Sequence, residues 1–289
     1  MDKRKILIQL DSDLHASVFD RVVAIDVGAD ELFAYGSVKP EHVQGLVHGA
    51  IFTRDAKELK NTAIFVGGSD VTAGETLMAE AVKHMLPKFG LRVSIMLDAN
   101  GANTTAAAAV RAASRHLELK GAKAIVLGGT GPVGQRVARL LAGEGAEVRV
   151  GSRQKAKAAA VCAEIIKRLP NARLEPIGTS SEAELREGLA DRTLVVAAGA
   201  AGIVLLSKSL RDACPNLKVA IDLNAVPPLG IEGVGVGDKA IDQAGVICYG
   251  AIGVGGTKMK VHRAAVASLF TSNDKILDAE EIYLLAKQF

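Results

Sequence analysis

The stretch from Lys123 to Gly134, Lys-Ala-Ile-Val-Leu-Gly-Gly-Thr-Gly-Pro-Val-Gly, constrains the fold of this chain more than any other. Its first half is a short apolar run with β-branched residues, which is typical of a strand buried on both faces. Gly129, Gly131 and Gly134 follow in the spacing GxGxxG. We expect these glycines to allow a tight turn, close approach of backbone to a pyrophosphate, and close packing of a helix, in that order.

The sequence around this motif distinguishes a nucleotide site from a purely structural turn. An amphipathic helix is predicted over Val133 to Ala142, and a second strand over Ala146 to Val150. Pro132 suits the first turn of such a helix, because the N–H that it lacks would have no intrahelical partner there. The order strand, turn, helix and strand favours a dinucleotide held at the N-terminus of the helix.

The end of the second predicted strand indicates which dinucleotide binds. An NAD site usually places Asp or Glu there, where it accepts a hydrogen bond from the ribose 2′-hydroxyl. This chain instead reads Gly-Ser-Arg-Gln-Lys over 151–155. Arg153 can pair with a 2′-phosphate, Ser152 can donate a hydrogen bond, and Lys155 adds positive charge. We therefore predict NADP rather than NAD, with a solvated helix start at Arg153 and Lys155 as the alternative.

Two later strands complete the predicted cofactor site. One runs from Leu194 and ends in small residues, and the other runs from Val219 toward a Pro-Pro pair. Small residues at a strand end leave room for the nicotinamide and its ribose, although tight helix packing also explains them. The predicted cofactor-binding residues are Gly129, Thr130, Gly131, Pro132, Val133, Gly134, Ser152, Arg153, Lys155, Ala198, Gly199 and Asn224.

The first third of the chain alternates predicted strands and helices. Strands are predicted over Ile6–Asp11, Ala63–Gly67 and Val93–Leu97, with helices from about Ser17 and over about 71–89. This alternation indicates a parallel sheet covered by helices, separate from the nucleotide-binding unit. The predicted fold is therefore α/β with two domains. Residues 1–115 with 260–289 form a substrate domain, and residues 116–259 form a Rossmann-type NADP-binding domain.

A polar segment follows the strand that ends at Leu97. It contains Asp98, Asn100, Asn103 and Thr104 before an alanine-rich helix predicted over 106–113. Ligands of open parallel sheets bind beyond the carboxyl ends of strands, so these donors and acceptors are candidate substrate contacts. Helix capping by Asn103 or Thr104 is the alternative, although it accounts for only one of these polar residues.

A glycine-rich segment near the C-terminus leads to Lys258, a candidate functional residue. Four glycines fall within residues 248–256, so we expect a tightly turning backbone that enters a helix only at about Met259 and continues to about Phe270. Lys258 would then begin this helix, where its charge opposes the helix dipole. That position favours an anionic or carbonyl partner for Lys258.

Composition excludes several classes of function. The chain has 289 residues, of which 49% are hydrophobic, and a net charge of +3, which is too small to indicate nucleic-acid binding. We expect no membrane span, because no window has about 18 uninterrupted apolar residues. The three cysteines and six histidines lack metal-ligand spacing, so no metal is expected, and His262 is expected to be a packed or surface residue. The short apolar run after Lys5 is no signal peptide, and a cytoplasmic location is expected.

Together these stretches resemble the NAD(P)-dependent methylene-tetrahydromethanopterin dehydrogenase family of methylotrophic bacteria. The resemblance runs nearly end to end, and its most specific parts are Leu97–Thr105 and Gly250–Arg263. The matching stretches are Ser17–Asp20, Thr62–Gly68, Met96–Thr105, Gly129–Gly134, Asn224–Gly230 and Gly255–Lys260.

The resemblance implies an oxidoreductase of one-carbon metabolism. Such an enzyme has two domains separated by a cleft, binds NADP and a pterin, and oxidises the methylene carrier to the methenyl cation. It implies a homo-oligomer such as a trimer. Some members use NAD as well as NADP, and some accept the tetrahydrofolate carrier. The resemblance also places Lys258 at the substrate, with Asp98, Asn100, Asn103 and Thr104 on the pterin side.

Two alternatives to this function remain open on the sequence. The first is an NADP-dependent dehydrogenase of a shikimate-type hydroxy acid, which needs a Lys–Asp pair that Lys258 with Asp98 or Asp222 could supply. The second is a non-catalytic module that senses NADP, which would not need the polar segment 98–105.

Overall fold

The computed structural model describes residues 3–289, which form two compact units. Unit 1 contains the chain up to Thr104 together with Met259–Gln288, and unit 2 contains Thr105–Lys258 with Phe289. The sequence placed these boundaries after residues 115 and 259. Unit 1 ends at Thr104, within helix α4 (Ala102–Ser114), so the division falls earlier than residue 115. Most of α4 belongs to unit 2. Helix α9 (Ala251–Ser268) crosses the second boundary.

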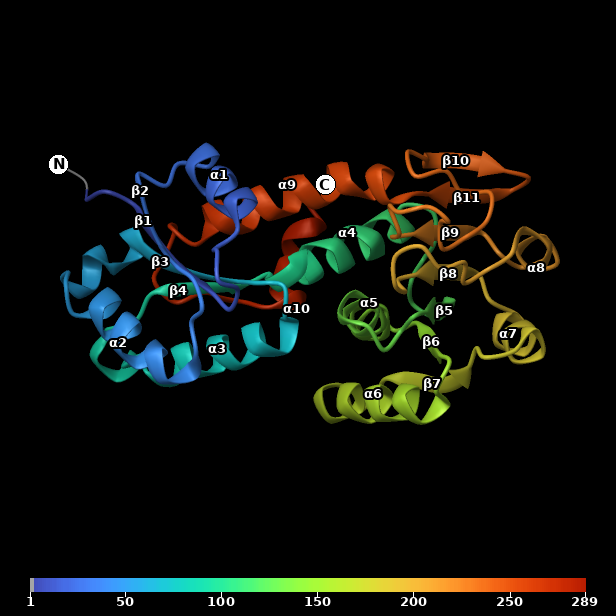
Figure 1. The fold of residues 1–289 in the computed structure, drawn as a ribbon, viewed down its shortest axis with the longest axis horizontal. Helices are drawn as coiled ribbons and strands as arrows, with labels where there is room; N and C mark the ends of the chain where they lie inside the picture. Colours follow the sequence, from blue (N-terminus) through green and yellow to red (C-terminus); the bar gives the residue numbers. More distant parts are fainter. Residues whose placement is uncertain (1–2) are drawn as a thin grey trace. The chain divides into compact units, whose positions relative to one another are not determined.

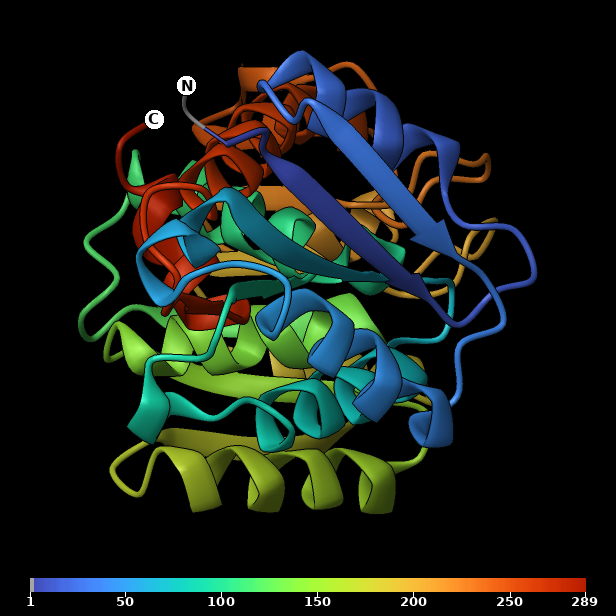
Figure 2. The same ribbon diagram turned by 90° about the vertical axis from the view of Figure 1, so that its left-hand side faces the viewer.

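Unit 1 is built on a five-stranded sheet in the order β12-β4-β3-β1-β2, in which every strand pair is parallel. Figure 2 shows β1 (dark blue) lying between β2 and β3. The strands are β1 (Ile6–Asp11), β2 (Glu31–Tyr35), β3 (Thr62–Gly67), β4 (Ser94–Leu97) and β12 (Ile276–Leu277). The helices within this unit are α1 (Val18–Asp26), α2 (Pro40–Ile51), α3 (Val71–Lys83) and α10 (Ala279–Ala286), with 3₁₀ turns η1 (Ala56–Asn61), η2 (Pro87–Phe89) and η3 (Ala99–Gly101).

The helix ends of unit 1 follow from local chemistry. Ser17 caps α1 by accepting a hydrogen bond from the backbone N–H of Asp20 at 3.3 Å. Asp278 and Glu281 form a capping box at the start of α10. The prediction of one helix over 71–89 was wrong, because α3 ends at Lys83. Pro87 lacks an N–H and disfavours helical backbone before it, so only the short turn η2 follows.

Unit 2 contains a seven-stranded sheet in the order β10-β11-β9-β8-β5-β6-β7. Only the β10–β11 pair of this sheet is antiparallel. The order from β7 through β5 to β11 is the doubly wound arrangement of a Rossmann domain, as the sequence predicted. The strands are β5 (Lys123–Leu127), β6 (Glu147–Ser152), β7 (Arg173–Gly178), β8 (Leu194–Ala197), β9 (Val219–Asp222), β10 (Lys239–Gln243) and β11 (Val246–Tyr249).

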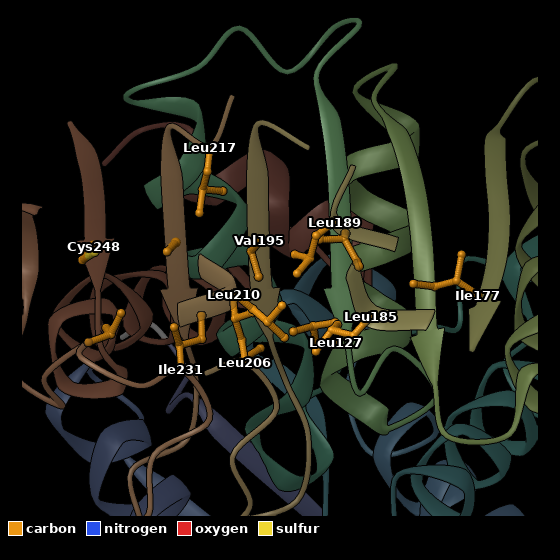
Figure 3. Close-up of a cluster of buried hydrophobic side chains, with 14 residues drawn as sticks. Leu127, Ile177, Leu185, Leu189, Val195, Leu206, Leu210, Leu217, Ile231 and Cys248 are labelled. Atoms are coloured by element: carbon orange, nitrogen blue, oxygen red, sulfur yellow. The ribbon is translucent and has the colours of Figure 1, made fainter. Parts of the chain in front are cut away.

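Helices cover both faces of this second sheet. Figure 1 shows α5 and α6 on one side of the strands and α7 and α8 on the other. On the α7 side, Leu185 and Leu189 pack with Leu127 and Val195 in a buried cluster, which Figure 3 shows in detail. Such burial is the main source of stability for the unit. The helices are α5 (Pro132–Gly143), α6 (Lys155–Arg168), α7 (Glu182–Leu189) and α8 (Lys208–Asp212).

The glycine-rich segment after β11 is helical, contrary to the prediction. Helix α9 begins at Ala251, eight residues before the predicted start, and therefore contains several glycines. A β-carbon at Gly250 would collide with the carbonyl of Gly235, and one at Gly253 would collide with the carbonyl of Asp238. The helix start thus packs directly on the 235–238 backbone, and this tertiary contact outweighs the low helix propensity of glycine.

Candidate functional site

The glycine turn lies between the carboxyl end of β5 and the start of α5. Gly128 has a φ of +70°, so it is the residue of the turn with left-handed backbone. A β-carbon at Gly128 would lie 2.5 Å from the Cα of Gly199, so only glycine fits at this position. At Gly129 a β-carbon would lie 2.7 Å from Cγ1 of Val150. At Gly134 it would collide with the carbonyl of Gly128, so helix and strand approach each other as closely as the sequence predicted.

Gly131 differs from Gly129 and Gly134, because a β-carbon there would make only ordinary van der Waals contacts. It has an extended φ of −76°, and a β-carbon there would have no neighbour nearer than the Gly128 carbonyl at 3.5 Å. The cleft next to it has a volume of about 510 Å³. Leu127 and Gly128 at the end of β5, and Ala198 and Gly199 at the end of β8, lie on its wall. These strands flank the point at which the strand order reverses, where open α/β sheets bind ligands.

The far end of this cleft is basic. Ser152, Arg153, Gln154, Lys157 and Thr179 line it, and none of the residues that line the cleft is acidic. Lys157 was missed by the sequence reasoning, although it lies one helical turn beyond Arg153. Ser152 is 8% exposed, and its hydroxyl accepts a hydrogen bond from the backbone N–H of Gln154 at 3.2 Å.

The remaining predicted cofactor residues lie in different places. Thr130, Gly131 and Pro132 line the cleft together with Ser152, Arg153, Ala198 and Gly199, whereas Gly129, Val133, Gly134, Lys155 and Asn224 do not. Lys155 is exposed on the first turn of α6. Its charge lowers the pKa of Glu184, a carboxyl shifted mainly by hydrogen bonds from Ser180.

Asn224 follows β9 and is engaged within its own loop. Its Nδ2 donates to the carbonyl of Pro228 at 3.3 Å, and its Oδ1 accepts from the N–H of Val226 at 3.0 Å. Asp222 beside it accepts from the N–H groups of Asn224 and Ile231, at 3.0 and 2.9 Å. Burial raises the pKa of Asp222, while these hydrogen bonds act in the opposite direction. Both side chains therefore shape the loop that leaves β9.

A second group of polar residues lies at the carboxyl end of β4 in unit 1. Asp98 is 2% exposed, and its two carboxylate oxygens accept from the N–H and the hydroxyl of Thr104, at 3.0 and 2.7 Å. The same carboxylate lies 3.1 Å from Nδ1 of His262 on α9. Asp98 therefore joins the start of α4 to α9, and we call Asp98, Thr104 and His262 the Asp98 cluster.

His262 is the residue of this cluster that the sequence reasoning undervalued. It is fully buried, as a packed residue would be, but its Nε2 has no hydrogen-bond partner among residues 3–289. Oδ1 of Asp20, on α1, lies 3.5 Å from that nitrogen. The rings of Phe19 and Phe65 lie 5.8 and 5.9 Å from the imidazole. His262 follows Lys258 by four residues, and this spacing could have indicated from the sequence that the two side chains share one face of a helix.

Asn100 and Asn103 differ sharply in exposure. Asn103 is 1% exposed, and its Nδ2 donates to the carbonyl of Leu97 at 2.6 Å and to Asp278 at 3.0 Å. Asn100 is exposed in the turn η3 with a φ of +53°. Helix α4 begins at Ala102 rather than 106, so the capping alternative for Asn103 and Thr104 was wrong, because both lie within the first helical turn.

Lys258 lies inside α9 rather than at its start. The helix has seven residues before it, so the argument from an opposing helix dipole at the N-terminus was wrong. Lys258 lies one turn before His262, and residues four apart on a helix share a face. Its placement in the substrate site therefore depends on the family resemblance and on this spacing.

Several features of the described residues bear on other kinds of site. Among residues 3–289, no group of three or more His, Cys, Asp or Glu side chains could hold a metal ion. No helix in that part of the chain combines the length and apolar character needed to cross a membrane. The three cysteines are free, and burial raises the pKa of Cys162 to about 11.

Comparisons with known proteins cover nearly the whole chain. A model described as methylene-tetrahydromethanopterin dehydrogenase, N-terminal, matches residues 18–100. A Methylorubrum extorquens protein named bifunctional protein MdtA is 45% identical over 287 residues, covering 99% of both chains. A second protein of that organism, named NAD(P)-dependent methylenetetrahydromethanopterin dehydrogenase, is 31% identical over 293 residues, covering 98% of both chains.

The solved structures that resemble this one share its fold at low identity. The ligand-free 5-ketofructose reductase of a Gluconobacter strain superposes with a TM-score of 0.53 at 14% identity, and the match covers 99% of both chains. Such a likeness shows the α/β fold alone, because one fold supports many reactions.

Proposed function

Because the chain belongs to the methylene-tetrahydromethanopterin dehydrogenase family, we propose that it transfers a hydride from methylene-tetrahydromethanopterin to NADP, yielding the methenyl carrier. Unit 2 binds the dinucleotide in this proposal, and unit 1 binds the pterin. The single observation that supports the cofactor assignment best is the cleft beside Gly131, with its basic and acid-free far end.

The residues of this cleft fit a phosphorylated dinucleotide. The open space at Gly131 admits a pyrophosphate next to the N-terminus of α5, whose N–H groups and dipole favour an anion. Arg153 and Lys157 supply two positive charges where the adenosine ribose of a Rossmann cofactor lies. A carboxylate at this position would select NAD, and none lines the cleft, so NADP is favoured.

The proposed reaction makes modest chemical demands on the protein. Bound NADP supplies the hydride acceptor. The methylene carbon lies between two nitrogens whose lone pairs stabilise the resulting amidinium cation, so the reaction requires no nucleophile or strong base. What the chain must contribute is alignment, because transfer needs the reacting atoms about 3–3.5 Å apart.

Unit 1 contributes the pterin side in this proposal. Asn100 is exposed and can contact the ligand directly, whereas Asp98 and Asn103 are buried and act through their neighbours. Asp98 positions Thr104 and His262, and Asn103 ties the end of β4 to the start of α10. The Nε2 of His262 forms no hydrogen bond within the described residues and lies 3.5 Å from Oδ1 of Asp20, so Asp20 can contribute to positioning the imidazole.

Lys258 orients the pterin in the same proposal. Its ammonium group would hold a pterin carbonyl or a water rather than the reacting carbon, since a positive charge close to that carbon would oppose the developing cation. Its position one turn before His262 on α9 supports this role.

The shikimate-type alternative has weaker support. Structures with this fold at 14% identity do not specify a reaction, and Asp98 is already bonded to Thr104 and His262. The methanopterin carrier is favoured over the folate carrier, because the 31% identical relative is named for it. We further propose a homo-oligomer, such as a trimer, and a cytoplasmic location, with which three free thiols are compatible.

One spectrophotometric assay tests the function. Purified protein is offered methylene-tetrahydromethanopterin or methylene-tetrahydrofolate with NADP or NAD, and reduction is followed at the nicotinamide absorbance band near 340 nm. We expect the highest kcat/KM for the methanopterin carrier with NADP. Light scattering on the same sample measures the oligomer. Tight NADP binding without turnover of either carrier would instead support a module that only senses NADP.

A further inference from the structure

Arg192 carries a buried charge in unit 2 at the entrance to β8. The residue is 6% exposed, and its Nε donates to the carbonyl of Ala190 at 3.1 Å. Among residues 3–289, no carboxylate pairs with it, and its two terminal nitrogens have no hydrogen-bond acceptor. Burial, together with the nearby charge of Arg149, lowers the pKa of Arg192, while the carboxylates of Glu147, Glu175 and Asp191 act in the opposite direction. A guanidinium remains protonated in proteins. A buried charge is costly unless it is paired.

The two arginines next to it each have a carboxylate partner. Arg149 donates from Nε to Glu175 at 2.7 Å, and Arg173 donates to Glu147 at 2.6 Å across the β6–β7 pair. Three guanidiniums and the carboxylates of Glu147 and Glu175 therefore meet at the amino ends of these strands, and the nearby carboxylate of Asp191 also acts on Arg192. Among residues 3–289, Arg192 is the one of the three guanidiniums without a carboxylate at ion-pairing distance.

The helix end nearby does not supply the missing partner. Arg149 already donates from Nη1 to three carbonyls at the C-terminus of α7, at 3.0–3.1 Å. Arg192 shares only the last of these carbonyls, and reaches it through Nε. Its Nη1 and Nη2 groups form a fork of the geometry that binds an oxyanion in bidentate fashion.

A hollow of about 300 Å³ lies beside this fork. Its lining comes from the amino halves of β6 and β7 and from Arg192. The three arginines are accompanied there by the carboxylates of Glu147 and Glu175, and Val148 and Leu174 add apolar surface. Its volume is at the lower end of the range for small-molecule sites. The hollow is distinct from the nucleotide cleft, which begins at the opposite end of β6, roughly 16 Å away along a strand of this length.

We propose that this hollow is a second anion site of unit 2, in which Arg192 binds the phosphate or carboxylate group of a small metabolite. Arg149 and Arg173 contribute positive potential, and the apolar surface accepts the body of the ligand. The site is independent of the proposed reaction, since none of its residues lines the nucleotide cleft.

Titration with inorganic phosphate and with acetate, at constant ionic strength and with chloride as the reference, tests the proposal. Binding is followed by calorimetry and by the rise in Tm on the full chain saturated with NADP, because phosphate can otherwise enter the nucleotide cleft. The same titrations on the protein without NADP keep the test valid if NADP does not bind. A response to phosphate alone assigns a phosphate ester as the ligand class, and one to acetate alone assigns a carboxylate.

Three variants give the expected pattern. Arg192→Gln weakens anion binding at least tenfold, since one charge-assisted contact is lost. Glu175→Gln strengthens it severalfold, because a carboxylate beside the site is removed, and a folding defect cannot produce a gain in affinity. Lys167→Gln, the same change of charge on an exposed side chain of α6, leaves it unchanged.

The outcomes that overturn the proposal are equally specific. If neither anion produces heat or a Tm shift at millimolar concentration, the hollow is not an anion site. If both anions bind but Arg192→Gln binds them as well as the unchanged protein does, the ion is held elsewhere. The affinity of NADP for Arg192→Gln is measured alongside and is expected to stay within twofold, which shows that the variant is folded.

Discussion

The nucleotide cleft of unit 2 and the Asp98 cluster of unit 1 both lie at the carboxyl ends of parallel strands, but they are built in opposite ways. The cleft is open, about 510 Å³ in volume, and lined largely by glycines and other small residues. The cluster is closed, with Asp98, Thr104 and His262 each at most 2% exposed and bonded to one another. In our proposal, a ligand contacts the cleft through exposed backbone, whereas the cluster mainly holds other residues in position.

The largest effect is expected from Gly131→Val. The branched side chain fills the open space that the pyrophosphate would occupy, while the extended backbone at this residue accommodates valine without strain. We expect NADP binding to be lost and the Tm of the protein without NADP to change by only a few degrees. Calorimetry measures the first and thermal unfolding the second.

Gly134→Val is the matched control for that experiment. A β-carbon at Gly134 would collide with the carbonyl of Gly128, so this variant should unfold at a much lower temperature. Equal Tm losses in the two variants would show that Gly131 also serves packing. Its role would then be structural, like that of the residues of the Asp98 cluster.

The next largest effect concerns the closed region. Asp98→Ala leaves three groups without their acceptor, the N–H and hydroxyl of Thr104 and Nδ1 of His262. At about 1–3 kcal/mol for each buried group, the free energy of unfolding should fall by about 3 kcal/mol or more. Urea unfolding measures it, and Asp98→Asn, which keeps one carbonyl oxygen, should lose less. Unchanged stability with a raised KM for the pterin would make Asp98 a direct ligand contact instead.

Lys258→Gln tests the residue that the resemblance places at the substrate. If Lys258 aligns the pterin for hydride transfer, turnover of the methylene carrier should fall by about 10²-fold, since small misplacements are costly in this step. NADP affinity, measured separately, should be nearly unchanged. Turnover within twofold of the unchanged protein would remove Lys258 from the active site, because substitutions away from special features usually have little effect.

Arg153→Ala changes cofactor preference rather than overall function. The variant removes a charge-assisted contact that only the 2′-phosphate of NADP can make, worth about 1.5–3 kcal/mol. We expect NADP affinity to fall by at least tenfold and NAD affinity to remain close to its original value. Equal losses for both cofactors would indicate that Arg153 supports the fold of the cleft.

The smallest effect separates two lysines of α6. Lys157 lines the cleft and Lys155 does not, although only Lys155 was predicted from the sequence. Lys157→Ala should weaken NADP severalfold, and Lys155→Ala should weaken it less, since exposed charges are screened by salt. A larger effect at Lys155 would show that Lys155, as predicted from the sequence, contributes more to NADP binding than Lys157 does.

The sequence predicted the parts of this molecule that depend on local patterns. The β5–α5 turn, the parallel strands β1, β3 and β4, and a helix that begins next to Ser17 follow from residues close together in the chain. Errors occurred where distant segments decide local structure. Helix α9, for example, extends through glycines because its start packs on the 235–238 backbone.

The sequence by itself determined the fold class, the glycine turn and the basic residues that follow β6, because hydrophobic period and motif spacing are local properties. Only the tertiary structure decided that Asp98 meets His262, 164 positions away in the chain, and that Lys157 lines the cleft. It also decided that Arg192 is buried without a carboxylate partner among the described residues. Such contacts form between distant segments, and a single sequence carries no local signal for them.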